Sequence, residues 1–194
     1  RLACQLRPTH DLAVLPLLPP SVAPEVAAAE PGFMAGQERE VCVLFADLRG
    51  FTALSERKLP YDVVFLLNRY FEVVGGAIEQ AGGITNQFTG DGVMAVFDGD
   101  GEGLPCAIDI QRQLSGEDWG AIGELRIRIG LDTGPAEARN GDYFGPVVNR
   151  SARVMDAGHG GQILCTPDVI AVHGLPDGAC AEDLGDHVLR GCTI

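Results

Sequence analysis

Apolar and polar positions along residues 39–194 form an ordered series that predicts alternating strands and helices. Residues 41–46 are a contiguous apolar run, which predicts a buried strand. From Val63 to Ile78 the apolar positions recur at helical spacing, with Pro60 near the first turn and Gly82-Gly83 at the end. This second segment therefore predicts a long helix.

The rest of the pattern predicts a hairpin, further helices and further strands. The expected elements are strands at 84–88 and 93–97 around a tight turn at 90–92, a helix at 104–114, a strand at 125–131, a helix at 146–157, a strand at 162–165, a helix at 167–172 and a terminal hairpin at 180–189. The order is βαββαβ with αβ additions. We therefore expect an α+β fold with a ferredoxin-like core, its helices packed on one face of a mostly antiparallel sheet.

Residues 1–38 differ from the rest in composition. They hold six of the 12 prolines and the run Ala27-Ala28-Ala29, which is typical of an extended linker. The chain opens at Arg1 without Met or a signal peptide, so we expect a piece of a longer polypeptide. We interpret residues 1–38 as the end of an upstream domain plus a Pro/Ala-rich linker, and residues 39–194 as a second domain.

Composition and charge narrow the class of partner. The apolar content of 46% is ordinary for a globular core, and the net charge of −13 argues against nucleic acid, which requires basic patches. No apolar run approaches the roughly 20 residues that span a bilayer. The six cysteines are scattered without a CxxC pair, which favours reduced thiols used as small apolar residues. We expect a cytoplasmic protein or the cytosolic part of a larger one.

Two aspartates stand beside short apolar runs, 44 positions apart. Asp47 follows the first predicted strand, and Asp91 lies in the turn of the predicted hairpin. A carboxylate at a strand's edge is open to a hard cation, and two on neighbouring strands could hold two Mg²⁺ or Mn²⁺ ions shared with substrate phosphates. The alternative is that Asp47 caps a turn and that Asp91 is a hairpin residue, since such turns favour Asp-Gly.

Three motifs occur in order along the second domain. They are Phe-Ala-Asp-Leu-Arg-Gly-Phe-Thr at 45–52, Phe-Thr-Gly-Asp-Gly-Val-Met-Ala-Val-Phe at 88–97 and Gly-Pro-Val-Val-Asn-Arg-Ser-Ala-Arg at 145–153. Together they resemble the catalytic domain of class III nucleotide cyclases, from about Glu38 to the C-terminal end. The resemblance implies an adenylate cyclase of intracellular signal transduction, which joins the ribose 3′-oxygen of ATP to its α-phosphate and releases pyrophosphate.

The resemblance also implies roles for individual residues. Asp47, the backbone carbonyl of Leu48 and Asp91 would hold the two Mg²⁺ or Mn²⁺ ions. Asn149 and Arg153, which are four apart and so share one helix face, would bind the ribose and the α-phosphate. In the family the aspartates of one protomer face the asparagine and arginine of another, so we expect a homodimer with two equivalent sites.

Further contacts to the substrate follow from the same resemblance. The loop at Gly50, Phe51 and Thr52 would turn amides toward the triphosphate, and Arg190 would contact its β- and γ-phosphates. Asp132 replaces a histidine common in the family, which would leave one phosphate contact empty. Arg150, one step round the helix from Asn149, is interpreted as a surface residue.

The base of the nucleotide is less well specified. Gln87 stands where adenylyl cyclases usually carry a lysine, and its partner position holds Asp142. This pair suits adenine and could also meet guanine, because glutamine both donates and accepts. Guanylate cyclase activity and a non-catalytic, nucleotide-binding regulatory domain remain alternatives. A diguanylate cyclase ranks last, because its Gly-Gly-Asp/Glu-Glu-Phe signature is absent.

Cys4 carries a separate resemblance. Residues 1–8 resemble the last-cysteine segment of a [2Fe–2S] ferredoxin. Such a cluster needs four cysteine thiolates, and the other three would lie upstream, so we expect no cluster in this chain by itself.

Overall fold

The computed structural model describes residues 36–99 and 101–189. The chain divides into two units, Arg1–Gly36 and Gln37–Ile194. The first unit lies outside the described residues except for Gly36, and so do Cys4 and Arg190. The predicted domain boundary, the ferredoxin resemblance and the phosphate role of Arg190 therefore stay predictions.

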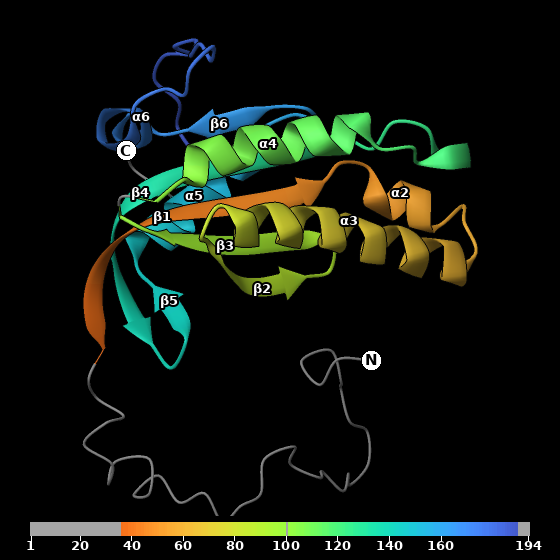
Figure 1. The fold of residues 1–194 in the computed structure, drawn as a ribbon, viewed down its shortest axis with the longest axis horizontal. Coiled ribbons are helices and arrows are strands. Elements are labelled where there is room, and N and C mark those ends of the chain that lie inside the picture. Colours follow the sequence, from red (N-terminus) through yellow and green to blue (C-terminus); the bar gives the residue numbers. More distant parts are fainter. Residues whose placement is uncertain (1–35, 100, 190–194) are drawn as a thin grey trace, which may run out of the picture. The chain divides into compact units, whose positions relative to one another are not determined.

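A mostly antiparallel sheet forms the centre of the second unit (Figure 1). Its strands are β1 (Gln37–Leu48), β2 (Ile84–Thr89), β3 (Gly92–Asp98), β4 (Ile127–Arg139), β5 (Asp142–Phe144) and β6 (Ile163–Cys165). Five of them follow the order β2-β3-β1-β4-β5, and β6 pairs with β4 in parallel. The predicted α+β fold with a mostly antiparallel sheet is confirmed.

The helices cover both faces of this sheet. They are α2 (Phe51–Ser55), α3 (Pro60–Gln80), α4 (Gly103–Gly116), α5 (Pro146–Ala157) and α6 (Pro167–His173), with a short 3₁₀ turn at Gly120–Ile122. Cys42 and Leu44 of β1 share one core with α3 and α4, whereas Val41 and Val43 pack with Val147 of α5. In Figure 1, α3 and α4 lie in front of the sheet and α5 behind it. The expectation of one covered face was wrong for α5, because the apolar run of β1 is buried on both sides.

Two segments differ from the predicted elements. β4 runs on to Arg139, well beyond the predicted end at 131, because its second half pairs with the start of β1, where Gln37 faces Ala138. The terminal hairpin predicted at 180–189 was wrong, since the structure has no strand there. Instead Asp183 accepts a hydrogen bond from the backbone N–H of Gly185, which forms a local turn.

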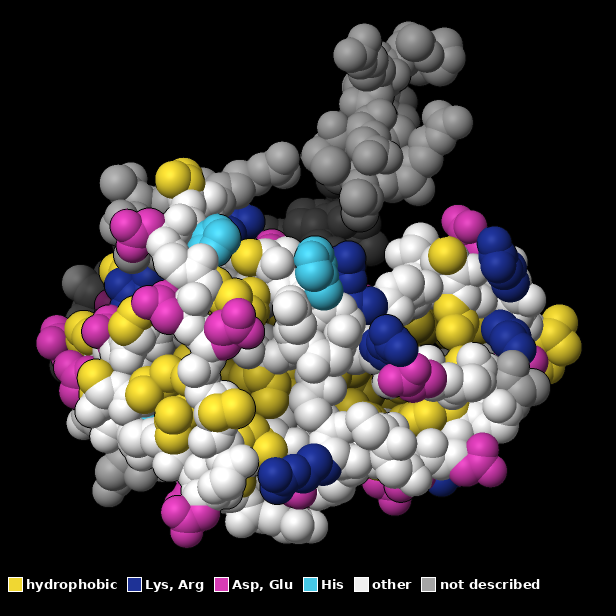
Figure 2. Space-filling model, turned by 90° about the horizontal axis from the view of Figure 1, so that it is seen from above, with side chains coloured by type: hydrophobic (Ala, Val, Ile, Leu, Met, Phe, Trp, Pro, Cys, Tyr) yellow, Lys and Arg dark blue, Asp and Glu magenta, His cyan; other side chains and the backbone are white. Residues whose placement is uncertain are grey.

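Two cysteines of the second unit are core residues, and the surface in view carries both acidic and basic side chains. Cys42 and Cys106 are buried, and burial raises the pKa of each thiol to about 12, so both stay protonated as core residues. On the face shown in Figure 2, basic side chains occur in small groups among acidic ones, without a broad basic field. Within the described ranges, no helix has the length and apolar character needed to cross a bilayer.

Candidate active site

Asp47 and Asp91 lie at the same end of two neighbouring strands. β1 and β3 pair antiparallel, and Asp47 stands opposite Gly92, the residue after Asp91. Gly90 takes a positive φ of 66°, which allows the tight turn that places Asp91 there. The pKa of Asp91 is raised above its ordinary value, first by burial and then by the charge of Asp47. The structure thus brings the two carboxylates together as a like-charged pair, which a cation would neutralise.

The candidate metal ligands are these two carboxylates and one backbone carbonyl. The side chain of Leu48 is buried in the core and has no ligand atom, so only its backbone carbonyl could bind an ion. Within the described part of the chain, no group of three or more His, Cys, Asp or Glu side chains could hold an ion alone. Mg²⁺ commonly binds one or two protein carboxylates and completes its shell with water and substrate phosphates. The donor set therefore fits a divalent ion that completes its shell with water and, when a nucleotide is bound, with phosphate oxygens.

Tyr70 of α3 places a polar atom near this pair. Its hydroxyl is buried and has no hydrogen-bond partner among the described residues. Its pKa is raised by burial and then by the charges of Asp47 and Asp91, so the phenol stays protonated. A buried hydroxyl normally has a hydrogen-bond partner, so Tyr70 can donate to a water molecule held beside the carboxylates.

Arg128 is a candidate site residue that sequence reasoning missed. It stands opposite Asp47 in the β1–β4 register, and its Nε and Nη2 donate to Oδ2 of Asp47 at 2.9 and 2.7 Å. Its side chain is only 14% exposed. Because the two residues are 81 positions apart, no local pattern links them. The signal that would have found Arg128 is the strand register.

Asn149 and Arg153 both lie on the solvent-facing side of α5. They are exposed, whereas Val147, Ser151 and Val154 on the other side of the helix are buried. The shared helix face expected from their spacing is therefore present. Their side chains point toward solvent, while the side chain of Asp47, at the end of β1, is only 19% exposed.

Asp132 and Arg150 form an ion pair, contrary to the expectation that Arg150 is a surface residue. Asp132 is fully buried and accepts hydrogen bonds from Nε and Nη2 of Arg150, at 2.6 and 3.1 Å, and from Oγ1 of Thr166 at 2.7 Å. Arg150 is therefore not a mere surface residue, whereas the phosphate contact left empty by Asp132 stays a prediction. A buried carboxylate needs such a partner, and this one ties the first half of α5 to β4.

The two residues proposed for the base lie where β2 meets the turn between β4 and β5. Asn86 donates to the carbonyl of Gly141 at 2.8 Å and to Oδ1 of Asp142 at 3.3 Å. Gln87, the next residue, is exposed beside a bulge in the β2–β3 pairing. β2 and β5 are the two outer strands of the sheet order, yet Asn86 of β2 contacts Asp142 of β5. Gln87 follows Asn86 directly in the sequence.

The proposed triphosphate loop joins β1 to α2. Gly50 has a φ of 76° at the start of α2, a left-handed conformation that favours glycine. Phe51 packs partly against the core, while Thr52 is exposed. The loop follows directly after Asp47 and Leu48, so its backbone begins beside the carboxylates.

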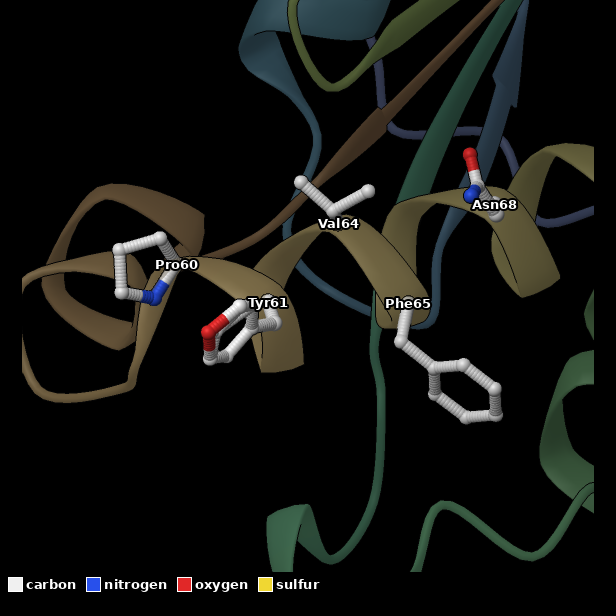
Figure 3. Close-up of a pocket in the computed structure, with 5 residues that line it drawn as sticks. All are labelled: Pro60, Tyr61, Val64, Phe65 and Asn68. Atoms are coloured by element: carbon white, nitrogen blue, oxygen red, sulfur yellow. The ribbon is translucent and has the colours of Figure 1, made fainter.

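Two surface hollows lie along α3 and contain none of the candidate site residues. Figure 3 shows the first, of about 380 Å³, with side chains that project from the start of the helix. It is lined by Pro60, Tyr61, Val64, Phe65 and Asn68. The second, of about 590 Å³, lies farther along and includes Glu117. The first hollow marks the exposed apolar start of α3, the second has several charged side chains, and neither includes Asp47 or Asp91.

Comparison with known proteins defines the family. Residues 33–192 match the family described as the adenylate and guanylate cyclase catalytic domain. The chain belongs to this family.

Relatives and solved structures agree with this assignment. An uncharacterized protein of Mycobacterium tuberculosis is 35% identical over 156 residues, which are 78% of this chain and 52% of that protein, so the chain spans about half its length. The adenylyl cyclase CyaB from P. aeruginosa is 26% identical with a TM-score of 0.71, covering 81% of this chain and 91% of that one. The guanylyl cyclase Cya2 is also 26% identical, with a TM-score of 0.64 and coverage of 75% and 89%.

Proposed function

We propose that this domain converts ATP to 3′,5′-cyclic AMP and pyrophosphate in intracellular signal transduction. The observation that carries the proposal is that Asp47 and Asp91 lie together at the same end of β1 and β3, in a chain of the cyclase catalytic family. Bound Mg²⁺ or Mn²⁺ ions would lower the pKa of the ribose 3′-hydroxyl and neutralise charge on the departing pyrophosphate.

Asp47, the Leu48 carbonyl and Asp91 would hold these ions. Arg128, already against Asp47, brings a permanent positive charge to the side where the phosphates would lie. The backbone amides from Gly50 to Thr52 would add hydrogen bonds to the triphosphate. Arg190 is proposed for the β- and γ-phosphates by the family resemblance alone.

Asn149 and Arg153 would act on the substrate of a second copy. Their exposure on α5 suits a surface that another protomer covers. In a homodimer, Asn149 would orient the ribose, and the Arg153 guanidinium would stabilise the charge that develops on the α-phosphate oxygens. Both residues would then complete a site whose carboxylates come from the partner.

Gln87 and Asp142 would read the base. Oδ1 of Asp142 already accepts a hydrogen bond from Asn86, which fixes its orientation. The exposed amide of Gln87 offers both a donor and an acceptor, so adenine and guanine can each be matched. ATP is the leading substrate and GTP is the second candidate.

A cyclase assay with Mn²⁺ and either ATP or GTP tests this proposal. We expect cyclic AMP from ATP, and a loss of about 100-fold or more in Asp47→Asn, which keeps the shape but removes the charge. Asp98→Asn is the matched control, because this exposed aspartate ends β3 at the opposite end of its pairing with β1. It should keep full activity.

The other outcomes separate the alternatives. Cyclic GMP as the main product would establish the second candidate. Tight nucleotide binding without release of pyrophosphate from either substrate would contradict catalysis and indicate a regulatory binding domain.

A further inference from the structure

Asp47 is the first member of a chain of ion pairs that runs from the end of β1 to α5. Arg128 contacts Asp47 through Nε and Nη2, and its Nη2 lies 3.3 Å from Oδ1 of Asp156. Asp156 in turn lies 3.8 Å from Arg153. One guanidinium is therefore shared between a candidate metal ligand and an aspartate at the end of α5.

Asp156 holds Arg128 at two points. Besides the ion pair, Nη1 of Arg128 donates to the backbone carbonyl of Asp156 at 3.0 Å. This carbonyl belongs to the last turn of α5, where carbonyls have no partner within the helix. The guanidinium is thus drawn toward α5 as well as toward β1.

This sharing leaves one oxygen of Asp47 unused by Arg128. Both hydrogen bonds from Arg128 go to Oδ2, and none goes to Oδ1. An arginine with a single carboxylate partner favours the two-point fork that occupies both oxygens. A divalent ion needs the same oxygens, so Arg128 and the ion compete for Asp47.

We propose that Asp156 is a positioning residue of the divalent-ion site. By holding Arg128, it keeps the guanidinium from closing on both oxygens of Asp47 and leaves this carboxylate open to the ion. The inference rests on the proposed function only in that Asp47 binds a divalent ion. The side chain of Asp156 is 51% exposed, so its replacement should not unfold the domain.

Mn²⁺ binding without nucleotide, followed by electron paramagnetic resonance, tests the proposal in a double-mutant cycle. Asp156→Ala should weaken Mn²⁺ binding about fivefold in the presence of Arg128, because the guanidinium closes on Asp47. In the Arg128→Met background, Asp156→Ala should change Mn²⁺ affinity by less than about twofold, because no guanidinium then competes with the ion for Asp47. Arg128→Met alone should strengthen binding.

Controls separate this inference from the function on which it rests. Glu117→Gln removes a carboxylate from the ion pair with Arg69, and Mn²⁺ affinity should not change. Equal losses from Asp156→Ala in both backgrounds would show a simple through-space charge effect and overturn the positioning role. A wild-type protein that binds no Mn²⁺, or binds it equally in Asp47→Asn, would instead refute the metal site of the proposed function.

Discussion

At the scale of single residues, the candidate site consists of two carboxylates and one guanidinium at the end of β1. Asp47 is neutralised in part by Arg128, whereas the pKa of Asp91 is raised by burial and by Asp47. The protein without metal therefore keeps a carboxylate in a place where its charge is unfavourable. Such a site favours occupation by a cation.

Asp91 should make the metal-free protein less stable as the pH rises. Its folded pKa lies above its unfolded value, so the folded state holds the proton longer than the unfolded chain does. The contribution of Asp91 to stability is therefore greatest below the ordinary aspartate pKa and falls as the pH rises through the raised pKa. At neutral pH in EDTA, we expect Asp91→Asn to melt at a higher temperature than the wild type.

Calorimetry at about pH 3 and pH 7 checks this prediction. The difference in melting temperature between Asp91→Asn and the wild type should be small at the lower pH, because the wild-type aspartate is then protonated and as neutral as the asparagine. The prediction would be contradicted if the melting temperature of the wild type rose relative to that of Asp91→Asn as the pH increased. Mn²⁺ should reduce the difference, because it stabilises the ionised carboxylate.

The residues that sequence could identify are those with a local signal. Asp47 and Asp91 stand beside apolar runs and within motifs, so the sequence marks them as candidates. Arg128 was not, because an arginine in an alternating strand is expected to face solvent, and its partner is 81 positions away. Arg150 was misjudged for the same reason, since its partner Asp132 is buried on another element.

At the scale of elements, α5 is held to β4 by close backbone contact and by one buried ion pair. A Cβ added to Gly130 of β4 would lie 2.2 Å from the backbone nitrogen of Met155. The Asp132–Arg150 pair fixes the earlier part of the helix. These contacts set the position of the face that carries Asn149 and Arg153.

Gly130→Ala should therefore displace α5. We expect a loss of about 3 kcal/mol in stability, because backbone atoms cannot move aside without separating the helix from the sheet. Thermal or urea unfolding measures the change. Gly76→Ala in α3 is the matched control: nothing lies within 4 Å of its added Cβ, and a helical glycine replaced by alanine should gain about 0.5–1 kcal/mol.

Equal stability of Gly130→Ala and wild type would show that α5 is not seated as described. Cyclase activity gives a second readout. The activity of Gly130→Ala should fall by more than its unfolded fraction accounts for, because Asn149 and Arg153 move with the helix.

The elements that sequence predicted well are those with strong local patterning. The helix at 146–157 begins with Pro146 and ends before Gly158, and the structure gives the same bounds. β5 was missed because three residues carry too little pattern, and it is defined by pairing with β4. The hairpin at 180–189 was wrong, because its residues make local turns instead of ladder contacts.

At the scale of the whole molecule, one copy carries both halves of the candidate site on separate elements. The carboxylates lie at the ends of β1 and β3, while Asn149 and Arg153 face solvent from α5. The net charge of −13 opposes the approach of a polyphosphate, and a bound cation would reduce this repulsion. In the proposed homodimer, a second copy would bring the two halves together, and divalent ions would neutralise the carboxylates.

The most direct test of this account is complementation between two inactive variants. Asp47→Asn and Asn149→Ala, each inactive alone, are co-expressed with different tags, and the mixed dimers are isolated through both tags. One of the two sites is then intact, so the mixed dimer should show about half the wild-type turnover of ATP. Mixed dimers as inactive as their parents would contradict a site shared between two copies.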